Sequence, residues 1–358
     1  MSRSGYDVVV VGAGVVGASA AAALAASGMS VAVVTGGDRV RVSATAASGG
    51  LVRCYESDPY LRSLALRSHE LLWGRPGQRR ELAGHRITGS LVCLTAEEAE
   101  KADAVLDELH DRGVRARLLC QREIARRWPA LGTERIVAGL WEPTGAYADP
   151  PRTAAMFLTQ ARRRGAVIFD GGAVALLLDG DTVYGVATEG VDLTARTVVL
   201  AAGSGTPALL PPTVRPRLRT RRVRYALVGW PPGTVPTIMD HVTGMWGRPY
   251  GADSLLVGRP VDEWDVRPAA GREITPAQFG YIRDGGVVRW PGLATAPLRG
   301  ARWGTDLYSP AGPHLGPVDN APGLVLATAW SGAGFKTAPA AGEAVVHAVH
   351  AVLEALER

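Results

Sequence analysis

The first residues that could do chemistry are three glycines in the pattern Gly-X-Gly-X-X-Gly, at Gly12, Gly14 and Gly17. They follow an apolar run, Val8 to Val11, and precede an alanine-rich segment. Gly12 permits a tight turn, Gly14 lets the backbone approach a pyrophosphate, and Gly17 lets the next helix pack on the strand. Because a helix N-terminus offers free N–H groups and a positive dipole, the pattern predicts a site for the phosphates of a dinucleotide.

The surrounding elements support this prediction. Gly28 closes the helix, and a second apolar run, Val31 to Val34, forms the next strand, so the order is strand, turn, helix, strand. Thr35 stands where an acidic residue usually binds the ribose hydroxyls. Thr35 and Asp38, three residues further along the turn, are the candidates for ribose binding; otherwise the ribose is held elsewhere.

Length and composition indicate an α/β enzyme of two lobes. No apolar stretch reaches the roughly 18 uninterrupted residues of a membrane span, and no signal cleavage site follows the first apolar run, so we expect a cytoplasmic protein without membrane contact. The net charge of +5 comes from arginines spread along the chain. This distribution favours solvated faces and some attraction for acidic ligands over nucleic-acid binding.

Cysteine, histidine and lysine usage narrows the chemistry further. The three cysteines, Cys54, Cys93 and Cys120, form no CxxC pair, and the histidines show no metal-binding spacing, so we expect neither disulfides nor a metal site. Of the 39 basic residues only Lys101 and Lys336 are lysines, so each of them raises the question of a specific role.

Further segments repeat the strand-and-glycine-turn pattern. A loop of small polar residues spans Ser43 to Gly50, and a buried strand ends in a glycine turn at Ala202 and Gly203. A second glycine turn, Trp330 to Lys336, precedes a helix expected from about Ala338 to the end. Residues Arg217 to Arg302 alternate polar and apolar positions, which predicts a mainly antiparallel sheet.

Four helices are expected besides the two that follow the glycine turns. The patterns place them at Pro59–Leu71, at Thr95–Arg112 with a capping box at its start, at Ile124–Trp128 and at Thr153–Arg164.

Four motifs in this order resemble the FAD-dependent amine and amino-acid oxidoreductases of the glycine oxidase and sarcosine oxidase type, within the D-amino-acid oxidase superfamily. They are the GAGVVG turn, the loop from Ser43 to Arg53, the segment from Asp149-Pro150-Pro151 to Ala202-Gly203, and the WSGAGFK turn with its helix. The resemblance implies a discontinuous Rossmann-type FAD-binding domain, residues 1–85, 145–216 and 303–358. The antiparallel substrate domain would then comprise residues 86–144 and 217–302.

The resemblance also implies where FAD binds. The pyrophosphate would lie at the first glycine turn and the adenine side near Val174, while the other loops line the isoalloxazine ring. The residues expected at the cofactor are Gly12, Gly14, Val15, Val16, Gly17, Thr35, Asp38, Ser43, Ala44, Thr45, Ser48, Gly49, Gly50, Val174, Ala202, Gly203, Gly332, Gly334, Phe335 and Lys336. NAD becomes the poorer choice of cofactor, because an NAD dehydrogenase needs no such additional nucleotide-contacting segments.

In the sarcosine oxidase branch an arginine after the glycine loop and the lysine of the GFK motif hold the substrate carboxylate, and Arg53 and Lys336 stand at these positions. A fork-shaped donor and a point charge suit a carboxylate. The alternatives are a structural salt bridge for Arg53 and a surface lysine for Lys336, although a helix start is a poor place for a cation. Tyr250 and Trp330 are expected to wall the substrate pocket.

Two departures from the family bear on the chemistry. Covalent members attach flavin through a cysteine in a Cys-Met-Tyr-like segment, whereas this chain has Thr305-Asp306-Leu307-Tyr308, so the FAD should be noncovalent. The lysine that promotes reaction with oxygen in those oxidases falls on Leu256 here. Rapid use of oxygen is therefore in doubt unless Arg248 or Arg259 substitutes.

These features predict an enzyme that oxidises the C–N bond of a small amino or imino acid by hydride transfer to flavin N5. The alternative is a flavin dehydrogenase, or a biosynthetic tailoring enzyme for an unusual cyclic amino acid, with poor oxygen reactivity. A non-redox flavoprotein or a subunit of a multi-chain complex is a more distant alternative. The sequence names neither the substrate nor the oligomeric state.

Overall fold

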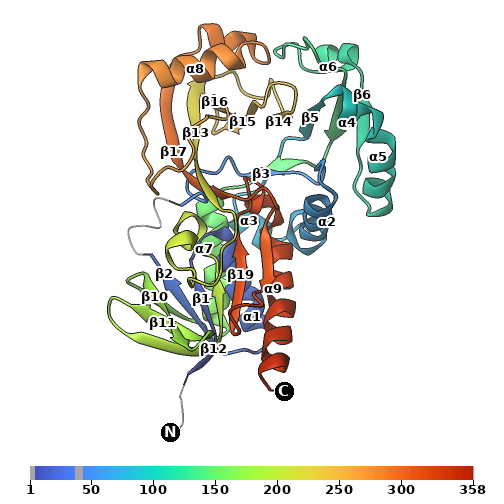
Figure 1. Cartoon of the computed structure of the whole chain (residues 1–358). Helices are drawn as coiled ribbons and strands as arrows, with labels where there is room; N and C mark the ends of the chain where they lie inside the picture. Colours follow the sequence, from blue (N-terminus) through green and yellow to red (C-terminus); the bar gives the residue numbers. More distant parts are fainter. Residues whose placement is uncertain (1–4, 37–42, 358) are drawn as a thin grey trace.

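The computed structural model describes residues 5–36 and 43–357, which form two large sheets and one small sheet (Figure 1). The first sheet runs in the order β10 (Ala173–Asp179), β11 (Thr182–Thr188), β12 (Asp192–Leu200), β1 (Tyr6–Val11), β2 (Val31–Thr35) and β9 (Val167–Asp170), and β19 (Leu324–Thr328) with β18 (His314–Pro317) joins it at β12. Strands β9, β2, β1, β12 and β19 are mutually parallel.

Alternation along β1 explains why both faces of this sheet are covered. Val8 and Val10 belong to a core with α1 (Val15–Ala26), α7 (Pro150–Arg163) and α9 (Gly334–Leu356), whereas Val9 and Val11 pack in a second core with residues of β10, β11 and β12. Because both faces are buried, the parallel strands read as continuous apolar runs. Helix α1 contacts both α7 and α9.

The second large sheet forms a roof over the first, at the top of Figure 1. Its order is β17 (Leu298–Tyr308), β13 (Arg219–Gly229), β16 (Ser254–Gly258), β15 (Trp246–Tyr250), β14 (Thr237–Asp240), β5 (Ser90–Leu94), β7 (Ala138–Glu142) and β6 (Arg117–Leu119). All neighbours are antiparallel except β14 and β5. The α/β fold class with a Rossmann-type sheet and a mainly antiparallel second sheet is thus confirmed.

The remaining elements connect and flank these sheets. A small sheet contains β3 (Leu51–Val52), β8 (Ala146–Tyr147) and β4 (Arg86–Ile87). The other helical segments are α2 (Pro59–Ser68), the π-helical η2 (His69–Trp73), α3 (Gln78–Leu82), α4 (Ala96–Glu100), α5 (Ala102–Asp111), α6 (Gln121–Arg127), the 3-10 turns η3 (Gly203–Ala208) and η4 (Pro291–Ala294), and α8 (Pro276–Gly286). Within the described ranges, no helix has the length and apolar character needed to cross a membrane.

Three expectations need correction. The single helix expected at Thr95–Arg112 is two helices, α4 and α5, because the chain tightens into an i to i−3 bond from Lys101 N–H to the Glu98 carbonyl; the capping box at Thr95 is confirmed. Helix α9 begins at Gly334 rather than near Ala338, so Lys336 lies in its first turn. The region expected to be antiparallel sheet also contains α8, which starts at its own capping box.

Candidate active site

A cavity of about 1030 Å³ has walls from both the parallel sheet and the roof. This volume lies at the upper end of pockets for organic ligands, roughly 300–1,000 Å³. Seventeen of the residues predicted to contact a cofactor line it: Gly12, Gly14, Val15, Val16, Ser43, Ala44, Thr45, Ser48, Gly49, Gly50, Val174, Ala202, Gly203, Gly332, Gly334, Phe335 and Lys336. Arg53 and Trp330 line the same cavity.

Four predicted residues are not placed on this wall. Gly17 supports the turn from behind. The Thr35 hydroxyl donates to Asp170 of β9 at 2.8 Å, and Asp38 lies outside the described residues. The Tyr250 ring faces the Arg248 guanidinium at 5.2 Å instead of the cavity.

The first glycine turn fits a phosphate. Gly12 has a φ of +112°, and a Cβ there would lie 2.3 Å from the Ala201 carbonyl oxygen. A Cβ on Gly17 would lie 2.0 Å from the Gly12 oxygen, so helix and strand meet at backbone contact. Among the described residues, the only atom near a Cβ on Gly14 is the Thr45 hydroxyl, at 3.2 Å, so this side of the turn is open to the cavity.

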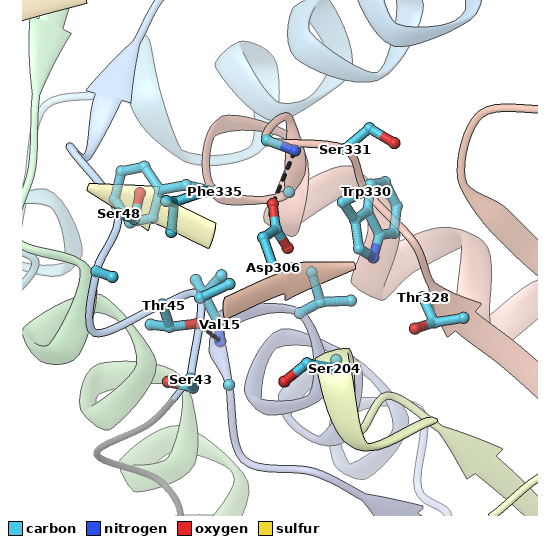
Figure 2. A pocket seen from close by; sticks show the side chains of 18 of the residues that line it. Val15, Ser43, Thr45, Ser48, Ser204, Asp306, Thr328, Trp330, Ser331 and Phe335 are labelled. Carbon is cyan, nitrogen blue, oxygen red and sulfur yellow. Dashed lines mark hydrogen bonds between the residues drawn. The ribbon is translucent and has the colours of Figure 1, made fainter. Parts of the chain in front are cut away.

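The N-terminus of α1 keeps the donors that an anion needs. Its first turn carries no acidic residue and no side-chain cap, so the positive end of the dipole is not neutralised. The Val15 N–H donates to the Thr45 hydroxyl at 3.0 Å (Figure 2), and that hydroxyl keeps its own proton to donate. Loop Ser43–Gly50 therefore adds a donor to those of the helix.

The second glycine turn is held in an uncommon backbone conformation. Ala329, Ser331 and Gly332 have φ values of 59°, 51° and 86°. Left-handed non-glycine residues cost roughly 1 kcal/mol or more each and cluster at functional sites. The Gly332 N–H donates to Asp306 Oδ2 at 3.0 Å, and Figure 2 shows the Asp306 side chain among other cavity residues.

Asp306 has an unusual acidity for a residue at the wall. Burial raises the pKa of Asp306 to about 6, and the N–H groups of Leu307 and Gly332 only partly offset this effect. Asp306 therefore places a titratable carboxyl in the cavity. Sequence analysis considered this segment only because it lacks the cysteine to which some members attach flavin.

Arg53 and Lys336 converge, as predicted, but on a residue that sequence reasoning missed. The Glu56 Oε1 atom lies 2.6 Å from Arg53 Nη2 and 2.8 Å from Lys336 Nζ. All three side chains are largely buried, with exposed fractions of 5% for Arg53, 6% for Lys336 and 12% for Glu56. The two cations thus already hold a carboxylate, and the only signal in the sequence was the spacing of Glu56 three residues after Arg53.

Burial and charge act in opposite directions on this cluster. Burial alone would raise the pKa of Glu56, but Arg53 and Lys336 outweigh it and lower that pKa. Burial lowers the pKa of Lys336; Glu56 opposes this shift, and Arg53 adds to it. The cluster carries one net positive charge when all three groups are ionised, which one further carboxylate would neutralise.

A second buried acid, Glu142 of β7, holds the backbone that carries Arg53. Its carboxylate accepts the N–H groups of Cys54 at 2.9 Å and Tyr55 at 2.8 Å. Burial raises the pKa of Glu142 despite these bonds. The sequence signal was a glutamate that ends an otherwise apolar strand.

The roof contains Leu256, which stands in place of the oxygen-activating lysine, and Arg248 and Arg259, the two residues that could substitute for it. Leu256 is fully buried and does not line the cavity. Arg248 pairs directly with Leu256 between β15 and β16, and its guanidinium donates to the carbonyl of Gly49 on the cavity loop. Arg259 lines the wall, but its guanidinium donates to the Tyr281 carbonyl of α8 at 2.8 Å.

The donor set suits a noncovalently bound flavin dinucleotide. Residues of both glycine turns line the cavity, and the described wall contains neither cysteine nor histidine to which a flavin could attach. Cys54 and Cys93 are buried elsewhere and Cys120 is exposed. Across residues 5–36 and 43–357, no cluster of three His, Cys, Asp or Glu residues is arranged to hold a metal ion.

Comparison with characterised proteins agrees with this geometry. The chain is 28% identical over 348 residues to the bifunctional protein ThiO/ThiG of Nostoc sp., covering 93% of this chain and 51% of that protein. It is 27% identical over 206 residues to the glycine oxidase of Geobacillus kaustophilus, covering 56% of this chain and 55% of the enzyme. The chain therefore spans about half the length of these curated relatives.

Solved structures share the fold. Glycine oxidase from Bacillus cereus superposes with a TM-score of 0.78 at 21% identity, covering 97% of both chains. L-proline dehydrogenase from P. horikoshii superposes with a TM-score of 0.83 at 21% identity, covering 95% of this chain and 92% of that one. The family profile for FAD dependent oxidoreductases (DAO) matches residues 7–348. This chain belongs to the DAO family of FAD dependent oxidoreductases.

Proposed function

We propose that this protein oxidises the C–N bond of a small amino or imino acid whose carboxylate is held by Arg53 and Lys336. The observation that carries the proposal is the convergence of these two cations on one carboxylate oxygen, that of Glu56, at the wall of the cavity. FAD, when bound, supplies the two-electron acceptor. The relatives with glycine oxidase and dimethylglycine dehydrogenase activity in their names support this substrate class.

Arg53 and Lys336 together form what we call the carboxylate clamp. This clamp has a donor available for a second carboxylate. Arg53 Nε is buried and has no hydrogen-bond partner among the described residues. A substrate carboxylate at this donor and at Lys336 would bring the cluster of Arg53, Lys336 and Glu56 to neutrality. Charge-assisted bonds of this kind are about twice as strong as neutral ones, and burial strengthens them further.

Glu56 also has a role in the proton balance of the reaction. The substrate amine must be neutral to release hydride, so the reaction favours high pH, whereas the clamp needs a protonated Lys336. Burial and Arg53 both lower the pKa of Lys336. By raising that pKa, Glu56 keeps the ammonium charged at the pH where the amine is reactive.

The second candidate is a dehydrogenase that reacts slowly with oxygen, including a tailoring enzyme for a cyclic amino acid. Leu256 favours the dehydrogenase, because this residue is buried in the roof and offers no charge to stabilise superoxide. The Arg248 guanidinium lies behind the Gly49 carbonyl and is already hydrogen-bonded there. Slow reoxidation of the reduced protein in air would favour this candidate.

The test begins with protein reconstituted with FAD and freed of oxygen. Glycine, sarcosine, proline, pipecolate and D-amino acids are mixed with it in turn, and flavin absorbance is followed. We expect at least one of these compounds to bleach the flavin. Lys336→Met should raise the KM for that substrate by at least about thirtyfold. If none bleaches it, the amine assignment fails.

Lys101→Met is the matched control, since it removes the other lysine of the chain. Lys101 pairs with Glu97 on the surface, where its side chain is 69% exposed. We expect it to behave like the wild type. Equal KM values for Lys336→Met and Lys101→Met would contradict the carboxylate clamp.

A further inference from the structure

One helical segment connects the two ends of the clamp. Helix α2 begins three residues after Glu56, with the Asp58 side chain as its N-cap, and continues into the π-helical turn η2. Turns of this kind are rare and frequently occur at functional sites. The segment therefore starts beside Arg53 and Glu56, and its other end lies against helix α9, which carries Lys336.

The first turn of α9 is weakened by Pro339. Proline has no N–H, so the Phe335 carbonyl lacks the donor that the fourth following residue normally supplies. Two side chains from α2 and η2 bond to the backbone at this point. Trp73 Nε1 donates to the Lys336 carbonyl at 2.7 Å, and the Ala340 N–H donates to Ser68 Oγ at 3.1 Å.

The π-helical turn sets the direction of the Trp73 indole. The Gly74 N–H donates to the His69 carbonyl at 2.8 Å, a bond to the fifth preceding residue. One extra residue in the turn rotates the next residues by about 100° relative to an α-helix of 3.6 residues per turn. A side chain on Gly74 would place its Cβ 2.3 Å from His69 Nε2, so the His69 ring, which packs against this turn, would have to move.

We propose that Trp73 is a positioning residue that fixes Lys336 at the carboxylate clamp through the hydrogen bond from its indole to the Lys336 carbonyl. Trp73 is 3% exposed and is absent from the cavity wall, so it acts through Lys336 and not on the substrate. Its ring also packs on Phe335 at 5.6 Å, and Phe335 does line the cavity. This inference rests on the proposed clamp.

Trp73→Phe tests the hydrogen bond while it keeps an aromatic ring against Phe335. Trp290→Phe is the matched control, because Trp290 is fully buried in the roof core and its Nε1 has no partner in the described structure. Both variants are reconstituted with FAD. Acetate, with acetamide as its neutral counterpart, is titrated against the visible flavin spectrum.

We expect Trp73→Phe to raise the acetate Kd by up to about tenfold over Trp290→Phe, the effect of one lost hydrogen bond. The acetamide Kd and the FAD Kd should be equal in the two variants. With a substrate identified as above, KM should rise while kcat stays within about twofold.

The outcomes separate this inference from the proposed function. If wild type binds acetate better than acetamide, Lys336→Met loses that preference and Trp73→Phe retains it, the positioning role is wrong and the clamp stands. If wild type shows no preference for acetate and Lys336→Met behaves like wild type, the clamp itself is wrong. A loss of acetamide and FAD binding together with acetate binding in Trp73→Phe would show a structural role only.

Discussion

Replacing Glu56 by glutamine tests the charge balance of the clamp directly. Glutamine keeps the shape of the side chain but removes the negative charge shared by Arg53 and Lys336. Two cations then lie close together at a buried site without an anion. The variant therefore changes the electrostatics of the clamp with little change in packing.

The size of the effect follows from burial. Removing one partner of a buried ion pair costs about 3–5 kcal/mol, and we expect the lower value because Lys336 can lose its proton. A cost of about 3 kcal/mol corresponds to roughly two pKa units. The pKa of Lys336, already lowered by burial in the wild type, should fall further in Glu56→Gln.

The sign of the pH dependence follows from proton linkage. In the window between the lowered pKa of Lys336 and its ordinary value of about 10.4, the unfolded chain binds more protons than the folded protein, so stability rises with pH. Glu56→Gln widens this window toward lower pH. Its deficit in unfolding free energy should be largest near neutral pH and smaller near pH 10.

The assay combines urea unfolding with acetate titration at pH 6, 7, 8 and 9. At pH 6 we expect acetate to bind Glu56→Gln at least as tightly as wild type. As the pH is raised, the acetate affinity of Glu56→Gln should begin to fall at a lower pH than that of wild type, because Lys336 loses its proton earlier. Glu70→Gln is the matched control: Glu70, like Glu56, pairs with two cations, here Arg67 and Arg112, but it is 30% exposed. We expect it to cost at most about 1 kcal/mol.

Parallel acetate profiles for Glu56→Gln and wild type would refute the reasoning. So would equal stability losses in Glu56→Gln and Glu70→Gln. Either result would mean that Glu56 does not hold the proton on Lys336.

Two further predictions concern the cavity wall. Gly12→Ala should lose FAD uptake and about 3 kcal/mol of stability, because its Cβ would overlap the Ala201 carbonyl at a positive φ; Gly28→Ala, also at a positive φ but in open space, should cost only about 1 kcal/mol and keep FAD. Flavin absorbance after gel filtration checks both, and coloured Gly12→Ala protein would contradict the expectation. Because the pKa of Asp306 is raised to about 6, the folded wild-type apoprotein holds a proton that the unfolded chain releases, and it should lose about 2 kcal/mol of stability as the pH rises from roughly 4 to 6. Asp306→Asn should remove that part of the pH dependence in urea unfolding. An unchanged profile would contradict the raised pKa of Asp306.

The predictable part of the site was the part encoded by local backbone constraints. At Gly12 a turn, a close carbonyl and a positive φ all exclude a side chain, so the requirement is visible in the residue type itself. The capping box at Thr95 is equally local and was also predictable. Tyr250 was not, because its direction depends on which face of β15 meets the cavity, and alternation in a short strand does not decide that.

The partners of the clamp were not predictable because they depend on tertiary contacts. Glu56 meets Lys336, and Trp73 meets its carbonyl, only after α2 and α9 have packed together. The early start of α9 also depends on tertiary contacts: side chains from α2 and η2 bond to the helix backbone on either side of Pro339, at Lys336 and Ala340.

The position of Lys336 at a helix start was itself informative, apart from the motif in which it occurs. A lysine in the first turn of a helix is opposed by the dipole, and burial opposes its charge a second time. Apart from Lys101, all other basic residues of the chain are arginines. A buried lysine at a helix start is stable only where a negative group compensates its charge. Sequence analysis predicted a substrate carboxylate as the partner of Lys336. Whether that acid belonged to a ligand or to the protein required the structure, which places Glu56 there and leaves one positive charge for a substrate.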